Sequence, residues 1–218
     1  AITVVCLVNL ILIRKVFSET LPHGKGTPPL KQVFSIFKTS DLRFLYTLFF
    51  FFMLGWIIIL QLLSTFLIEH FTGTKLMITA TFVRVGLAWC IGNMLINKLL
   101  LRFLKPKFIL FNALLLSTIC LFVASRITNF LLFYHFMFFG GLFASLTWTN
   151  TLSLISIRAP GNLQGKLLGL NQSVATISMI FAPLFGGMVG EFDTRTIYLF
   201  ASGSFLISLI SFIIFNIK

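Results

Sequence analysis

Acidic residues are scarce in this sequence, and so is charge of any kind. Asp and Glu number 5 among 218 residues, against 17 Lys and Arg, and charged residues make up 10% of the chain. A soluble domain carries about 25% charged residues. Apolar residues make up 58%, which is more apolar surface than a soluble globule buries. The composition therefore excludes an ordinary soluble domain.

Patterns that indicate catalysis or a resident cofactor are also missing. The three cysteines, Cys6, Cys90 and Cys120, stand apart without a Cys-x-x-Cys pair, which argues against a disulfide framework or a zinc site. No Gly-rich loop ends in Lys-Ser or Lys-Thr, so an ATPase is not expected. The three histidines lie far apart, and no Ser-His-Asp order stands out. We therefore expect neither an enzyme nor a bound cofactor or metal.

The sequence contains several long apolar runs. Six of them are long enough to cross a bilayer as helices, which takes about 17–25 residues, and they are apolar all round rather than striped. A β-barrel would need segments of about ten residues with alternating hydrophobicity. The sequence therefore predicts an all-α membrane protein with six transmembrane helices, at residues 44–68, 76–96, 108–125, 130–157, 167–190 and 197–217.

A shorter apolar run precedes these six. Residues 1–13 would form a helix about 20 Å long, against a hydrocarbon core of about 30 Å, and we interpret them as the end of a truncated span. The prolines and glycines of residues 14–43 predict a linker. The expected organisation is thus the end of a span at 1–13, a linker at 14–43 and a six-helix unit at 44–218.

The basic residues predict the orientation of the six-helix unit. Thirteen of the 17 Lys and Arg lie in alternate gaps, at 14–43, 98–107, 158–166 and 218, whereas three lie in the other gaps and one lies within a span. Cytoplasmic loops retain Lys and Arg, so we expect the 14–43 loop and the C-terminus in the cytoplasm. The net charge of +12 is then a topology signal of a multi-pass membrane protein, in the inner membrane if bacterial, with no nucleic-acid partner.

Short motifs add a resemblance to this layout. Residues 19–22 read Glu-Thr-Leu-Pro, and residues 162–165 read Asn-Leu-Gln-Gly just before the fifth span. A Gly-x8-Ser-x3-Ala-Pro-x2-Gly-Gly pattern within that span consists of Gly169, Ser178, Ala182, Pro183, Gly186 and Gly187. This pattern is similar to the antiporter motif of drug:proton antiporters. The whole layout resembles the C-terminal half of a major facilitator superfamily transporter of the tetracycline-exporter-like branch.

The resemblance implies a set of partners. The six spans would be numbers seven to twelve of a transporter, and they would face an N-terminal six-helix half across a midplane site, with membrane lipid around both. The substrate would be a small molecule exchanged for protons.

The patterned residues of the fifth span are predicted to act in conformational switching. Small side chains let helix backbones approach closely in lipid, and a proline leaves one backbone carbonyl unbonded. A helix with these features can flex between inward-open and outward-open states. The alternative is a helix that is only kinked and tightly packed.

Polar residues within the spans are candidates for substrate binding. An Arg at the centre of a membrane helix costs about 2.5–3.5 kcal/mol on insertion scales, so we expect Arg84 to face a cavity and an anionic group, or else to pair with carbonyls or a carboxylate. Trp56 and Trp148 could stack on an aromatic substrate or pack in the core. The substrate-binding candidates are Gln61, Arg84, Trp148, Asn150, Asn171 and Gln172, although each amide could instead bond a neighbouring helix.

One histidine is a candidate for proton coupling. Histidine titrates near physiological pH, and His135 lies close to the outer end of its span. Its alternative role is that of an interfacial side chain.

The expected function is secondary active transport, specifically proton-coupled efflux of a drug or small metabolite by alternating access. Two alternatives stay open at this point. One is a nutrient or organic-anion importer of the same fold, with Arg84 as the anion partner. The other is a non-transporting membrane receptor or remnant.

Overall fold

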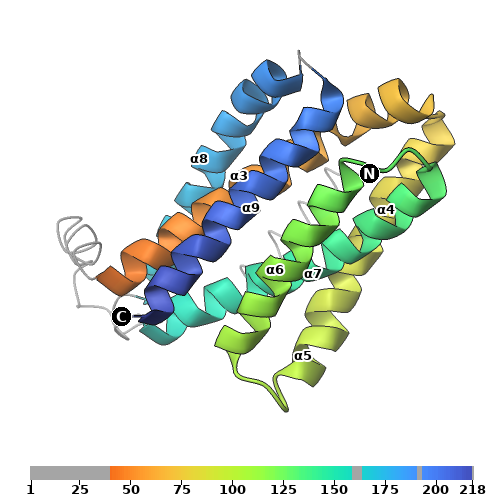
Figure 1. Ribbon diagram of the computed structural model, residues 1–218. Helices are drawn as coiled ribbons and strands as arrows, with labels where there is room; N and C mark the ends of the chain where they lie inside the picture. Colours follow the sequence, from red (N-terminus) through yellow and green to blue (C-terminus); the bar gives the residue numbers. More distant parts are fainter. Residues whose placement is uncertain (1–39, 159–163, 191–192, 218) are drawn as a thin grey trace, which may run out of the picture. The chain divides into compact units, whose positions relative to one another are not determined.

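The computed structural model describes residues 40–158, 164–190 and 193–217. The run at 1–13, most of the linker at 14–43 and the motif at 19–22 lie outside this part of the chain. Within the described ranges every regular element is a helix, and six helices are long and apolar enough to cross a membrane. The predicted all-α membrane fold and its six spans are therefore confirmed (Figure 1).

Five of the spans are single helices, and the second is divided by a short π-helical turn. In a π-helical turn the backbone hydrogen bonds join residues five apart instead of four. Such turns are frequent at functional sites. The elements, labelled as in Figure 1, are α3 (Ser40–Phe71), α4 (Lys75–Ile91), η1 (Gly92–Ile96), α5 (Asn97–Leu100), α6 (Pro106–Ala124), α7 (Phe130–Arg158), α8 (Gln164–Gly190) and α9 (Thr194–Ile217).

The helix starts follow local sequence signals that the apolar runs did not reveal. The hydroxyl of Thr74 accepts a hydrogen bond from the Met77 backbone N–H (3.3 Å) at the start of α4. The side-chain oxygen of Asn129 accepts a hydrogen bond from the Leu132 backbone N–H (3.2 Å) at the start of α7. Pro106 lies in the first turn of α6. These residues satisfy or replace N–H groups that have no partner within the helix. Five of the six described spans begin one to four residues before the predicted apolar runs, and the fourth begins at the predicted residue.

Helices α3 and α7 form the centre of the bundle. Helix α3 packs against α8 and α9, α7 packs against α4 and α6, and α6 and α9 pack against each other. Figure 1 shows α9 alongside α3 over most of its length. The most apolar stretch of each of α3, α6, α7 and α9 is 44–61% buried, whereas those of the second span and of α8 are each only 22% buried. Two of the six spans are therefore left largely uncovered by the others.

An aromatic cluster joins the central helices at one end of the bundle. Phe66 of α3, Phe133 of α7 and Tyr198 of α9 are fully buried, and their ring centroids are 4.5–5.5 Å apart. Tilted and edge-to-face rings at this distance are the arrangements that aromatic side chains prefer. This cluster fixes three spans against one another close to the turns at Phe71, Asn129 and Asp193.

Close contact between α4 and α7 depends on glycine. A Cβ on Gly92, where the π-helical turn begins, would overlap the hydroxyl oxygen of Ser145 and lie 3.0 Å from the carbonyl oxygen of Leu142. Gly141 of α7 meets Val85 of α4 in the same region, since a Cβ on it would lie 3.2 Å from a methyl carbon of Val85. The two helices thus approach each other as small residues allow in lipid.

We predict that Gly92→Ala destabilises the bundle by about 1–3 kcal/mol, the usual cost of forcing an extra carbon into a packed site. Gly86→Ala is the matched control on the same span, because a Cβ there meets no atom within 4 Å. The measurement is thermal unfolding of the full-length protein in detergent. Equal melting temperatures for the two variants would contradict the close contact described above.

Candidate functional site

The three tryptophans of the chain line a single cavity. Its volume is about 420 Å³. Helices α3 and α4 each contribute four residues at the same i, i+3, i+4, i+7 spacing, which places them on one face of their helix. The lining residues are Met53, Trp56, Ile57 and Leu60 of α3, Phe82, Val85, Gly86 and Trp89 of α4, Trp148 of α7 and Met179 of α8.

The indole rings form a continuous aromatic wall. The rings of Trp56 and Trp89 are stacked, with centroids 5.4 Å apart and an interplanar angle of 26°. Trp148 lies 6.3 Å from Trp89 and 5.3 Å from Phe49. No residue of the lining is charged. A cavity of this kind favours a ligand with a flat aromatic or amphiphilic surface, since ring faces attract other rings and cations.

An amide next to the cavity holds one of these rings in place. The side-chain oxygen of Asn93, in the orientation that its neighbours favour, accepts a hydrogen bond from Nε1 of Trp89 (3.0 Å). Its NH₂ group then donates to the Ser145 carbonyl (3.1 Å) and to the Thr149 hydroxyl. Both partners belong to α7, so this amide links the indole of α4 to the neighbouring helix. The orientation of Trp89 is therefore set by a polar contact as well as by packing.

The cavity lies where the bundle is least covered. Its walls include residues of α4 and α8, and the apolar stretches of these two spans are only 22% buried. Gly86 faces this space, and a Cβ added to it would meet no atom within 4 Å. The described part of the chain thus forms one side of the cavity and leaves the other side open.

Comparison with known proteins agrees with this arrangement. A family model, that of the Major Facilitator Superfamily, matches residues 45–217, which include nearly all the described residues. The chain belongs to the major facilitator superfamily. A search of curated proteins gives no match. The family match establishes a multi-pass membrane protein with the general function of a secondary transporter, and it does not distinguish the branches of the family.

In this facilitator chain, three of the predicted substrate residues lie at or beside the cavity. Trp148 lines the cavity. Gln61 is exposed on α3, four residues beyond Ile57 of the lining, and Gln172 is exposed on α8, seven residues before Met179. Because residues four and seven apart share a helix face, both amides lie on the faces that carry cavity residues. Their roles in substrate binding stay predictions.

Two of the predicted amides are buried between helices of the facilitator bundle. Asn150 donates to the side-chain oxygen of Asn97 (2.8 Å) and to the carbonyl of Leu146 (2.8 Å). Asn171 is 4% exposed. Among the residues that the structure describes, the side-chain oxygens of Asn150 and Asn171 have no hydrogen-bond partner. A buried acceptor without a partner is costly, so both amides are incompletely bonded within the described part of the chain.

Arg84 lies outside the cavity lining. Its guanidinium carbon is 4.2 Å from the centroid of the Tyr134 ring and 5.3 Å from that of Phe138, both on α7. The Tyr134 hydroxyl in turn donates to the carbonyl of Ala80 on α4 (3.5 Å). A cation over ring faces is stabilised by their negative quadrupole. This partner for an intramembrane charge was not among those that the sequence suggested.

His135 is exposed near one end of α7. Its Nδ1 lies 2.6 Å from the carbonyl of Leu131, one turn earlier. With Asn129, Leu131 and Leu132 it lines a shallow cavity of about 450 Å³ that shares no residue with the tryptophan cavity. Its role in proton coupling stays a prediction.

The six patterned residues of α8 divide between two faces. Ser178, Ala182 and Gly186 are buried at four-residue spacing, and a Cβ on Gly186 would lie 2.6 Å from a methyl carbon of Leu62 on α3. The exposed members are Gly169, Pro183 and Gly187. The first group lets α8 lie close to α3, whereas the second lies on a surface that the described residues leave open. Their role in conformational switching stays a prediction.

The sequence alone did not single out Trp89 or Asn93 as site residues. Each lies in a span where an isolated indole or amide can equally well serve packing. Their spacing was the available signal, because residues four apart on a helix are neighbours and an indole N–H needs an acceptor when buried.

We predict that Arg84 and Tyr134 are energetically coupled. In a double-mutant cycle of Arg84→Gln and Tyr134→Leu, the coupling should be about 0.5–2 kcal/mol, the range of cation–π pairs. The cycle cancels the separate effect of removing an intramembrane charge. Unfolding of the full-length protein in detergent measures it, with Arg84→Lys as the variant that keeps the charge. Additive effects of the two changes would show that the Tyr134 ring does not stabilise the guanidinium.

Proposed function

We propose that this chain forms one side of the transport path of an exporter that exchanges drugs or small metabolites for protons. The observation that carries the proposal is the cavity with three tryptophans and no charged lining residue. Such walls suit an aromatic or amphiphilic molecule that is neutral or cationic. The proposed substrate class is accordingly flat and largely apolar.

Alternating access needs a second side to the path. The uncovered faces of α4 and α8 support a partner unit there, which we propose to be an N-terminal six-helix half of the same transporter. In transporters of this kind the two halves rock about a midplane site. The exposed Gly169, Pro183 and Gly187 on α8 are suited to a contact that changes during rocking, because they present little side chain.

The proposal of proton coupling is supported by the pattern of α8 and not by the residues that line the cavity. Two carboxylates whose side chains the structure describes, Glu69 and Asp193, lie in the last turn of α3 and just ahead of α9, and Asp193 lies 3.5 Å from His70. Neither lines the tryptophan cavity. We therefore propose that the main proton-carrying carboxylate is supplied by the partner half, and the antiporter-like pattern of α8 is what favours exchange with protons.

The position of Arg84 gives less support to import of an organic anion. That alternative depends on a guanidinium that reaches the path, whereas Arg84 lies over Tyr134 and Phe138. A neutral or cationic substrate fits the described lining better. This is why such a substrate is proposed here in preference to an organic anion.

We predict that an imposed pH gradient drives uptake of a fluorescent aromatic cation into proteoliposomes that contain the full-length protein in inside-out orientation. Protons released from an acidic lumen supply the driving force. Substrate accumulation should disappear when a protonophore collapses the gradient. Accumulation that is unchanged without the gradient would rule out proton coupling while leaving facilitated transport in place.

We further predict that Trp148→Ala raises the KM for this cation about 2–10-fold, since an aromatic pair contributes about 0.5–1.5 kcal/mol beyond its buried area. Trp148→Phe keeps a ring and should restore most of the affinity. Phe139→Ala is the control, because Phe139 is an exposed ring on the same helix outside the lining. Equal KM values for Trp148→Ala and the control would remove the tryptophan cavity from the transport path.

A further inference from the structure

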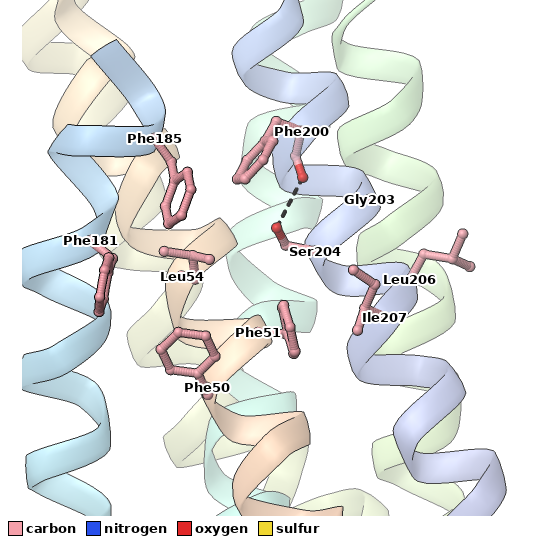
Figure 2. A pocket seen from close by; sticks show the side chains of 10 residues that line it. All are labelled: Phe50, Phe51, Leu54, Phe181, Phe185, Phe200, Gly203, Ser204, Leu206 and Ile207. Carbon is pink, nitrogen blue, oxygen red and sulfur yellow. Dashed lines mark hydrogen bonds between the residues drawn. The ribbon is translucent and has the colours of Figure 1, made fainter. Parts of the chain in front are cut away.

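A second and larger cavity lies between α3, α8 and α9, and its lining is almost purely hydrocarbon. Its volume is about 710 Å³. Figure 2 shows Phe181 and Phe185 of α8 facing Phe200 of α9, with Leu54 of α3 between the two helices. The lining residues are Phe50, Phe51, Leu54, Phe181, Phe185, Phe200, Gly203, Ser204, Leu206 and Ile207.

This cavity offers a polar ligand nothing to bind. Its one polar side chain, Ser204, donates its hydroxyl proton to the carbonyl of Phe200 in the same helix (3.0 Å), the bond drawn in Figure 2. Burying a polar group without a hydrogen bond is unfavourable. The lining therefore suits a hydrocarbon group.

The cavity is on the opposite side of α8 from the tryptophan cavity. Successive residues of a helix are about 100° apart, so Phe181 points about 200° away from Met179, which lines the other site. Phe181, Leu206 and Ile207 are 41–47% exposed. The second cavity is thus separate from the proposed transport path, and its rim is exposed.

A shallower cavity continues this one toward the start of α3. It has a volume of about 390 Å³, shares Phe50 and Phe51 with the larger cavity, and also includes Val174 and Ile177 of α8. On α3 the two cavities together follow one helix face from Arg43 to Leu54. About eleven residues of helix are about 16 Å long, so the two cavities form one groove of roughly the depth of a membrane leaflet's hydrocarbon.

A basic side chain stands at the mouth of this groove. Arg43 is exposed, and among the described residues its guanidinium has no carboxylate partner and lies 5.8 Å from the Phe44 ring. The other polar groups of the mouth are already bonded, since the Tyr46 hydroxyl donates to the Leu167 carbonyl (2.9 Å) and the Thr47 hydroxyl to the Arg43 carbonyl (2.9 Å). Among the described residues that line the groove, most are apolar, and Arg43 at its end is the one charged side chain.

We propose that this groove is a binding site for an anionic phospholipid, with one acyl chain between α8 and α9 and the phosphate at Arg43. A guanidinium matches phosphate with two parallel hydrogen bonds. The end of the bundle that carries Arg43 is the one rich in Lys and Arg, which the positive-inside rule assigns to the cytoplasmic leaflet, where anionic lipids and basic residues meet. The chain of the lipid fills the space that α8 and α9 leave over α3.

The test is native mass spectrometry of the full-length protein with phosphatidylglycerol and phosphatidylcholine of identical acyl chains. Wild-type protein should retain phosphatidylglycerol in preference, and Arg43→Gln should lower that preference about fivefold, the effect of one basic residue near an anionic surface. Arg102→Gln is the matched control, because Arg102 is exposed in the turn after α5, outside the groove. An equal loss of preference in both Arg variants would overturn the site.

A second variant tests the acyl chain rather than the headgroup. Gly203 lines the groove, and a Cβ on it meets no atom within 4 Å, so Gly203→Leu fills the space without a clash at its first carbon. Retained lipid should fall for both headgroups, while the melting temperature in lipid-free detergent stays unchanged. Undiminished lipid retention in Gly203→Leu would refute the proposal. A dimer that carries no lipid, with a second copy of the chain in the groove, would refute it as well.

Discussion

Helices surrounded by lipid gain little by covering one another's apolar side chains, since lipid tails are as apolar as leucine. The position of α3 therefore depends on close fit and on neighbouring side chains that reach its backbone. Ser178 of α8 donates to the carbonyl of Phe50 (3.3 Å), and Ser208 of α9 donates to that of Leu48 (2.9 Å). Both bonds reach α3 within one helical turn. Helices α8 and α9, which flank the proposed lipid groove, are thus fixed to the same part of α3.

This arrangement explains why α8 borders two unlike cavities. Its buried face lies on α3, so one flank is directed toward the tryptophans and the other toward α9. Met179 on the first flank contributes a thioether to an aromatic wall, and sulfur packs favourably against aromatic rings. Phe181 and Phe185 on the second flank stack on each other (5.9 Å). One poorly buried helix consequently separates a site suited to substrate from a groove suited to lipid.

The sequence was sufficient for the spans and insufficient for the register between them. Runs of apolar residues predicted six helices because a bilayer requires each backbone to satisfy its own hydrogen bonds, and that requirement acts on each segment separately. The stack of Trp56 on Trp89 depends on the height of α4 relative to α3, which no single segment encodes. Arg84 illustrates the same limit: its charge predicted a partner, but the partner is a ring on α7 that lies about fifty residues away in sequence.

The division of the α8 pattern shows how a motif can serve two requirements. Ser178, Ala182 and Gly186 are the small residues with which α8 packs against α3. Small side chains interlock less with a neighbouring helix than large ones do, so they oppose sliding of α8 along α3 less. Pro183 has no N–H to donate to the carbonyl of Met179, so α8 lacks one backbone hydrogen bond where it passes the tryptophan cavity. If α8 tilts about this point in the proposed switching, a tilt that narrows one cavity would widen the other, because their linings lie on opposite flanks. A lipid chain bound on one flank would then favour one of the two tilts, and its differential affinity for the two states would set how far it shifts their populations.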